Sequence, residues 1–263
     1  MSVTHINLGR NGRLGNQMFQ ITSTIGVALK NGVDYSFPNW VCYESKSEYH
    51  KFFTKKLPLL NINSQIINIH ETQFNYKDIE IPNDGKIYSL NGYFQTEKYF
   101  KEYEDIIREY FTPIEEIELE IDLKYKNILK NSCSIHIRRG DYIGQTSHHP
   151  IQSLEYYYQG IKEIYGDNIN DVNFLIFSDD IEWCKKNITL PNIHFIENNI
   201  NIIDMMLMSK CENNIIANSS FSWWGAWLNK NVDKKVIAPK KWFGESLRHY
   251  NTDDIIPKKW VTI

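Results

Sequence analysis

The second half of the chain alternates short apolar strands with helices, and this alternation constrains the fold more than any other feature. Strand patterns lie at residues 134–137, 172–177, 193–197, 214–217 and 235–238. Helical patterns lie between and after them, at residues 153–165, about 181–186, 202–210 and from about 223 onward. Strands that alternate with helices form a parallel sheet with helices on both faces. Ligands of such sheets bind at the carboxyl ends of the strands.

The first half of the chain has a weaker pattern. Residues 4–8, 32–37 and 86–90 are typical of strands, and residues 17–30 and 99–111 are typical of helices. Residues 39–88 mix short isoleucine-rich pieces with Asn, Lys and Pro, and they allow no prediction. Residues 114–131 are first acidic and then basic, with weak helical spacing, and they are the best candidate for a linker. We therefore expect two α/β domains, residues 1–130 and 131–263.

Composition excludes several classes of protein. The 263 residues carry a formal net charge of -3, which gives no general attraction to nucleic acid. The four cysteines are widely separated and form no CxxC pair, which argues against a zinc site and fits a cytosolic protein. The N-terminus has no long apolar run, and no segment approaches the roughly 20 apolar residues that cross a bilayer. We expect no signal peptide and no transmembrane segment.

The stretch Ser-Ile-His-Ile-Arg-Arg-Gly-Asp-Tyr at residues 134–142 places charged groups where a strand ends. A guanidinium group matches two phosphate oxygens and stays charged at any working pH. Because adjacent residues of a strand point to opposite faces, we expect Arg138 to reach inward and Arg139 to stay wetter. His136 could donate to a phosphate or a base, and Asp141 could hold Arg138 or the amides of the loop. A structural Arg–Asp pair beside a satisfied core histidine is the alternative.

A glycine-spaced loop precedes the first predicted helix. It contains Gly12, Arg13, Gly15, Asn16 and Gln17. A strand, a glycine loop and a helix N-terminus make an anion-binding corner, because the first N–H groups of a helix lack partners. The glycine spacing does not match the dinucleotide fingerprint. A plain tight turn is the alternative.

A third polar cluster follows the strand at 214–217. It consists of Asn218, Ser219, Ser220, Phe221 and Ser222, and it precedes a tryptophan-rich helix. Hydroxyl groups and unpaired N–H groups suit phosphate oxygens, and Phe221 could lie against a base or ribose. The alternative is an ordinary helix cap, with Ser222 as the capping residue.

A pair of carboxylates, Asp179 and Asp180, follows the strand at 172–177. The pair could accept hydrogen bonds from ribose hydroxyls or from the N–H edge of guanine. A metal site is the alternative, but two aspartates without a nearby His or Glu are a weak metal signal.

Together, these motifs resemble the bacterial α-1,2-fucosyltransferases of glycosyltransferase family 11. The resemblance runs from about residue 8 to about residue 240 and rests on residues 12–17, 136–142, 177–180 and 218–227. It implies a GT-B type architecture, with two facing Rossmann-like α/β domains and the donor site in the cleft. It also implies GDP-fucose as donor, inversion at the transferred carbon, and no essential metal or other cofactor.

The resemblance assigns roles to individual residues. Arg138 would contact the β-phosphate of the donor, in place of a cation. Ser219, Ser220 and Phe221 would form the diphosphate-binding turn. The N-terminal loop, with Gly12, Asn16 and Gln17, would face donor and acceptor.

The expected reaction is transfer of L-fucose to the 2-hydroxyl of a terminal β-galactoside, during synthesis of a surface glycan such as O-antigen or capsule. Transfer to another hydroxyl or to a protein, a non-catalytic GDP-sugar-binding module and a carbohydrate-binding protein are the alternatives. The sequence identifies neither a catalytic base nor the acceptor beyond its terminal galactose. We expect a cytoplasmic protein, and peripheral contact with the inner membrane stays open.

Overall fold

The computed structural model describes residues 1–263, which divide into two compact units. Unit 1 comprises Met1–Ile114 and Tyr250–Pro257, and unit 2 comprises Glu115–His249 and Lys258–Ile263. The chain therefore passes from one unit to the other after Ile114, after His249 and after Pro257. None of the helices is long and apolar enough to span a membrane.

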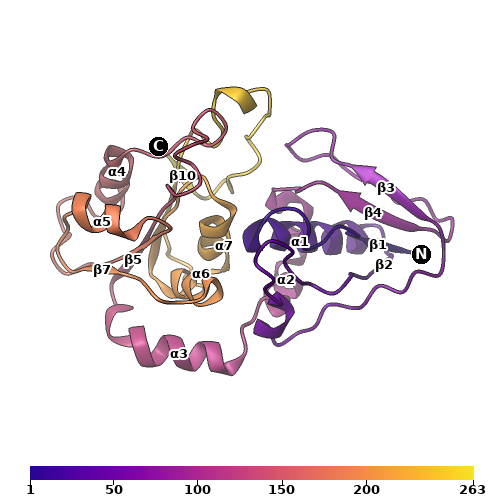
Figure 1. Ribbon diagram of the computed structural model, residues 1–263, viewed down its shortest axis with the longest axis horizontal. Coiled ribbons are helices and arrows are strands. Elements are labelled where there is room, and N and C mark those ends of the chain that lie inside the picture. The colour runs from indigo at the N-terminus through magenta and orange to yellow at the C-terminus, as the bar shows by residue number, and fades with distance from the viewer. The chain divides into compact units, whose positions relative to one another are not determined.

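Unit 1 is built on a parallel sheet with the strand order β2-β1-β4-β3 (Figure 1). The strands are β1 (Ser2–Thr4), β2 (Asp34–Tyr35), β3 (Ile66–His70) and β4 (Ile87–Asn91). The helices are α1 (Leu14–Lys30) and α2 (Glu104–Tyr110), with 3-10 turns at Tyr49–Phe52, Glu97–Tyr99 and Lys101–Tyr103. Helix α1 is buried over most of its length. A Cβ on Gly26 would lie 2.0 Å from the Tyr99 carbonyl oxygen, so glycine permits this close packing.

Unit 2 has a parallel sheet of six strands in the order β10-β9-β8-β5-β6-β7. The strands are β5 (Ser132–Ile137), β6 (Asn173–Ser178), β7 (Ile193–Phe195), β8 (Asn213–Ile215), β9 (Val236–Ala238) and β10 (Val261–Thr262). The connecting helices are α4 (Leu154–Tyr165), α5 (Ile181–Asn187), α6 (Asn201–Lys210) and α7 (Ser220–Leu228). Helices α4 and α5 lie on one face of the sheet, and α6 and α7 lie on the other (Figure 1). The predicted doubly wound parallel sheet is confirmed.

The central strand of unit 2 explains why the sequence pattern was clear there. Every residue of β5 is buried, since helices cover both faces of the sheet. Its sequence alternates the polar residues Ser132, Ser134 and His136 with the apolar residues Cys133, Ile135 and Ile137, a period that is typical of a strand. The segment that follows its carboxyl end, residues 138–142, is called the arginine loop below.

The predicted linker at 114–131 is wrong. Residues Glu115–Tyr125 form helix α3, followed by a 3-10 turn at Lys126–Ile128. Ile117 and Ile121 are buried, Glu118 pairs with Lys210, and Tyr125 donates a hydrogen bond to Asn199. Helix α3 therefore belongs to unit 2, and the boundary falls at Ile114 rather than at residue 130. The 52% and 86% exposure of Leu119 and Leu123 blurred its helical pattern.

Several element boundaries in unit 1 also differ from the prediction, including the start of α1, which is Leu14 rather than residue 17. The first strand is Ser2–Thr4 instead of 4–8, and the second is only Asp34–Tyr35. The helix predicted at 99–111 is interrupted, because residues up to Tyr103 form 3-10 turns before α2 begins. The edge strand β3 lies in the region that allowed no prediction.

Candidate functional site

Arg138 lies just beyond the carboxyl end of β5 and is held by two carboxylates. Its Nη2 lies 2.7 Å from Asp141 Oδ2, and its Nε lies 3.1 Å from Asp179 Oδ2. The side chain is only 17% exposed. The predicted contact between Asp141 and Arg138 is confirmed. These bonds involve Nη2 and Nε of the guanidinium group.

Arg139 is as buried as Arg138, so the prediction that it stays wetter is wrong. Its side chain is also 17% exposed, with Nε 3.1 Å from Asp180 Oδ2. Its guanidinium group lies 3.8 Å from the centre of the Trp183 ring. Both arginines follow the last residue of the strand, so strand alternation does not govern them. Trp183 provides an apolar surface that the motif alone did not reveal.

Asp179 and Asp180 hold the arginine loop. Asp179 Oδ1 accepts a hydrogen bond of 2.9 Å from the Arg139 backbone N–H, and Asp180 caps the N-terminus of α5. A Cβ on Gly140 would lie 2.7 Å from Asp179 Oδ2, which explains the glycine in the motif. Both carboxylates contact arginines. Their predicted role toward ribose or guanine stays a prediction. No group of three or more His, Cys, Asp or Glu side chains is arranged to hold a metal ion.

His136 points from β5 into a buried environment, and its ring centre lies 5.6 Å from that of Phe221. The residue is 5% exposed, and its Nδ1 has no hydrogen-bond partner. One ring nitrogen of this buried histidine is therefore unsatisfied. Burial, with a smaller contribution from the charge of Arg138, lowers the pKa of His136 to about 3. The imidazole is thus neutral near pH 7 and can act there only as a neutral hydrogen-bonding group.

Residues 218–222, the serine turn, include the capping residue and the first residues of helix α7. Ser219 is the capping residue, and its Oγ accepts a hydrogen bond of 3.3 Å from the Phe221 N–H. Ser222, the predicted cap, lies inside the helix, is 1% exposed and donates to the Ser219 carbonyl oxygen. Ser220 is the first residue of α7. The turn therefore presents Ser219, Ser220 and Phe221 at a helix N-terminus but withholds the Ser222 hydroxyl.

Asn218 organises the loops around this turn. It is 2% exposed, its Nδ2 donates to the Trp242 carbonyl oxygen, and its Oδ1 accepts from Gln152. These bonds use its side-chain amide, so the structure gives it a supporting position. Its predicted role in donor binding stays a prediction.

Tyr142 connects the arginine loop to the serine turn, and our sequence reasoning did not select it. Its hydroxyl donates a hydrogen bond of 3.0 Å to the carbonyl oxygen of Asn218. Its ring centre lies 5.5 Å from the Arg138 guanidinium carbon. The ring also stacks on His149, with 4.8 Å between ring centres and 19° between planes. The only signal in the sequence was its position at the end of the arginine motif.

The glycine loop belongs to unit 1 and is fixed by a buried glutamine. Gln17 is fully buried, and its Nε2 donates a hydrogen bond of 2.7 Å to the Gly12 carbonyl oxygen. Its Oε1 accepts a hydrogen bond of 2.8 Å from the Trp40 indole N–H. Gly12 has a φ of 71°, which favours glycine. The buried side chain of Gln17 therefore links the glycine loop to Trp40 and stabilises the loop conformation.

The other predicted residues of this loop lie around the start of α1. Asn16 Oδ1 accepts a hydrogen bond of 2.7 Å from Gln95. Arg13 precedes the helix and pairs with Glu44 on the surface. Gly15 is buried in the first turn of the helix. The helix N-terminus has no capping side chain, as expected for an anion-binding corner, but ligand contact by these residues stays a prediction.

Comparison with known proteins identifies a family and several relatives. The family description "Glycosyl transferase family 11" matches residues 3–263. The chain is 43% identical over 184 residues to an alpha-1,2-colitosyltransferase of Escherichia coli, which covers 65% of this chain and 61% of that protein. It is 36% identical over 191 residues to the O-antigen biosynthesis glycosyltransferase WbnK of Escherichia coli, covering 67% of this chain and 61% of that protein. The chain thus spans about three fifths of the length of these relatives.

Solved structures share the fold. Fucosyltransferase NodZ from Bradyrhizobium has a TM-score of 0.61 and 13% identity, covering 86% of this chain and 93% of NodZ. POFUT1 in complex with GDP-fucose has a TM-score of 0.58 and 10% identity, covering 89% of this chain and 96% of POFUT1. At such identities the likeness concerns fold alone, and it confirms the predicted α/β fold of GT-B type.

Proposed function

This chain belongs to glycosyltransferase family 11, and from that premise we propose that it transfers a sugar from a GDP-activated donor to a glycan hydroxyl. The first candidate reaction moves L-fucose from GDP-fucose, with inversion, to the 2-hydroxyl of a terminal β-galactoside. The observation that carries the proposal is the placement of Arg138 at the edge of the sheet, tied through Tyr142 to the N-terminal turn of α7.

The chemistry of the leaving group supports this assignment. As GDP departs, negative charge develops on its diphosphate, and a fixed guanidinium group stabilises that charge. Asp141 and Asp179 hold the Arg138 side chain in place, and we propose that its guanidinium group contacts the β-phosphate. A preorganised donor of this kind contributes ~3–4 kcal/mol at a transition state.

The carboxylates around the two arginines offset their positive charge, so binding of a diphosphate needs a further source of attraction. Two guanidinium groups, Arg138 and Arg139, lie among the carboxylates of Asp141, Asp179 and Asp180. The arginine loop alone is therefore not a strongly positive site. We propose that the N-terminus of α7 supplies the remaining attraction, because a helix N-terminus carries about half a positive charge.

No residue of the motifs is proposed as the catalytic base. Asp141 bonds to Arg138, so it is placed to orient the guanidinium group rather than to take the acceptor's proton. His136 would serve as a neutral hydrogen-bond donor toward the diphosphate, because its pKa is far below 7. A reaction without metal, with arginine in place of the cation, is part of the proposal.

Colitose is a second candidate for the transferred sugar. The observation that favours it is the 43% identity to an alpha-1,2-colitosyltransferase. Synthesis of a surface glycan is favoured by the 36% identity to an O-antigen biosynthesis glycosyltransferase. We propose that the chain acts in such a synthesis, on the cytoplasmic side.

A direct assay tests the proposal. The protein is incubated with lactose and either GDP-fucose or GDP-colitose, GDP release is measured, and the product linkage is determined by NMR. We expect an α-1,2-linked product from at least one donor. Binding of GDP-fucose without turnover on lactose, on other glycans or on protein acceptors would instead identify a non-catalytic GDP-sugar-binding module.

A matched pair of variants tests the role of Arg138. Arg138→Ala should reduce turnover about a hundredfold or more, from the ~3–4 kcal/mol above. Arg108→Ala is the control, because Arg108 is 18% exposed, pairs with Glu104 and lies in helix α2 of unit 1. Near-normal turnover of folded Arg138→Ala would refute the assignment.

A further inference from the structure

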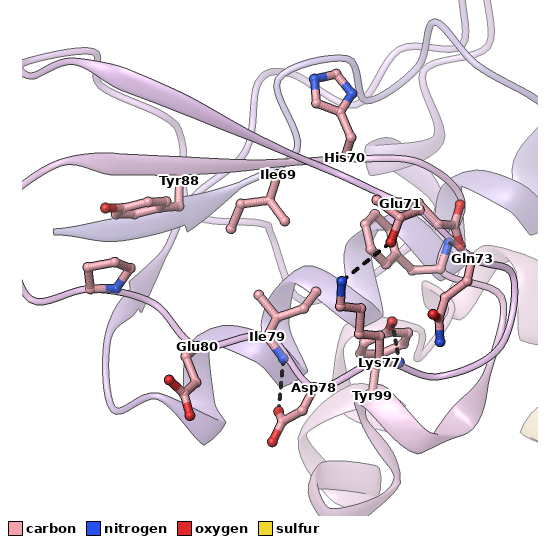
Figure 2. A pocket seen from close by; sticks show the side chains of 13 residues that line it. Ile69, His70, Glu71, Gln73, Lys77, Asp78, Ile79, Glu80, Tyr88 and Tyr99 are labelled. Carbon is pink, nitrogen blue, oxygen red and sulfur yellow. Dashed lines mark hydrogen bonds between the residues drawn. The ribbon is translucent and has the colours of Figure 1, made fainter.

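Unit 1 contains a pocket of about 330 Å³ beneath the edge strand β3, which the proposed reaction at Arg138 does not use. Figure 2 shows Ile69 and Tyr88 on the strand side of this pocket and Ile79 and Tyr99 on the opposite side. Protein interiors are close-packed and rarely leave a void much larger than a water molecule. The volume falls in the range of ligand sites, roughly 300–1,000 Å³.

The wall opposite the strands is fixed at several points. The Lys77 backbone N–H donates a hydrogen bond of 3.2 Å to the Tyr99 hydroxyl. Asn31, just after helix α1, donates to the Ile79 carbonyl oxygen and accepts from the Ile81 N–H, each at 2.9 Å. These bonds hold the segment away from the sheet on both sides of Ile79. The pocket is therefore preformed.

The base of the pocket is built by a carboxylate that shapes the following turn. Glu71 accepts hydrogen bonds of 2.8 Å from the Tyr93 N–H and 2.9 Å from the Phe94 N–H. Phe94 is 2% exposed and has a positive φ of 53°, a conformation that these two bonds support. An ordered turn thus completes the lining.

The charges that line the pocket select against anions. Three carboxylates, of Glu71, Asp78 and Glu80, line it together with the ammonium group of Lys77, and Asp78 also pairs with Lys30 at 2.6 Å. A phosphate or nucleotide would face net repulsion. A neutral ligand rich in hydroxyl groups has partners here, since carboxylates and the amide of Gln73 accept or donate hydrogen bonds while aromatic and aliphatic surfaces cover apolar C–H faces.

We propose that this pocket binds an uncharged sugar residue of the acceptor glycan, at a position other than the galactose that receives the transferred sugar. The inference rests on the proposed function for the identity of the glycan, but binding at the pocket can be measured without turnover. The site would add affinity for long acceptors and none for lactose.

The test uses lactose and the neutral, galactose-terminated tetrasaccharide lacto-N-tetraose. Ile79→Trp fills the pocket, and Ile62→Trp is the matched control, because Ile62 is 61% exposed in the same unit and does not line the pocket. We expect Ile79→Trp to raise KM for the tetrasaccharide about tenfold, a loss of ~1.4 kcal/mol of binding free energy. KM for lactose, KM for the donor and kcat should not change, and Ile62→Trp should match the wild type.

Gln73→Ala, at an exposed position on the rim, gives a second variant should Ile79→Trp fail to fold, and we expect a smaller change in the same direction. An unchanged KM for the tetrasaccharide, or an equal rise for lactose, overturns the proposal. If no transfer occurs at all, the proposed function fails separately. In that case, saturation-transfer NMR of the tetrasaccharide with wild-type protein and Ile79→Trp still decides: loss of binding in the variant supports the pocket, and equal binding overturns it.

Discussion

Replacing Tyr142 with phenylalanine removes one hydroxyl group and leaves the aromatic ring in place. The lost hydrogen bond, of 3.0 Å, joins the arginine loop to the carbonyl oxygen of Asn218, directly before the Ser219 cap of α7. The ring can still contact Arg138 and His149. The substitution therefore removes the bond between the arginine loop and Asn218 while it keeps the ring contacts of residue 142.

The expected size follows from the burial of the acceptor. A hydrogen bond contributes about 1 kcal/mol net, and a buried polar group left without a partner costs about 1–3 kcal/mol. Asn218 is 2% exposed, so Tyr142→Phe should cost about 1–1.5 kcal/mol. If that energy positions Arg138 against the donor, kcat/KM for the sugar nucleotide should fall about five- to tenfold.

Steady-state GDP release at varied donor concentration measures this effect, and urea unfolding measures stability in parallel. A double-mutant cycle with Arg138→Lys identifies the route, because the Tyr142→Phe effect should shrink when the guanidinium group is already absent. Unchanged kcat/KM together with lower stability, or full additivity in the cycle, would show that Tyr142 only supports the fold.

Three further outcomes can be checked by urea unfolding. Arg139→Ala should lower the free energy of unfolding by about 1 kcal/mol, because it removes the stacking on Trp183, and an unchanged midpoint would contradict this. The unfolded state takes up a proton on His136 below its usual pKa of 6.5, whereas the folded state does not until about pH 3, so wild-type stability should fall as pH drops. At pH 5 this contribution is about 2 kcal/mol, and a His136→Gln variant with the same pH dependence would refute it. Gln17→Leu should cost about 2 kcal/mol, since the buried Trp40 indole N–H loses its acceptor, and a cost near zero would argue against this role.

The parallel sheet of unit 2 could be predicted because its signals are local. Strand β5 alternates polar and apolar residues along its length and ends directly before two arginines. In unit 1, β3 is an edge strand whose residues are partly buried or exposed, so its apolar pattern was weak. Helix α3 was missed for a related reason, since its exposed Leu119 and Leu123 disguise the buried stripe.

In the site, too, contacts between residues close in sequence could be predicted, and contacts between distant residues could not. Arg138 and Asp141 are three residues apart, so their pairing could be inferred from the motif. The contact of Arg139 with Asp180 and the bond from Tyr142 to Asn218 join residues 41 and 76 positions apart. Such contacts depend on the order of strands in the sheet, which periodicity does not encode.

The return of Tyr250–Pro257 to unit 1 affects how the chain is made as well as how it folds. Asp254 accepts a hydrogen bond of 2.9 Å from the Tyr76 N–H and pairs with Lys98. During synthesis, Asp254 leaves the ribosome only after residues 115–249. Unit 1 therefore cannot form these contacts until most of unit 2 has been synthesised. Because β10 also follows His249 and pairs with β9 in the sheet of unit 2, one truncation after His249 would leave both units incomplete.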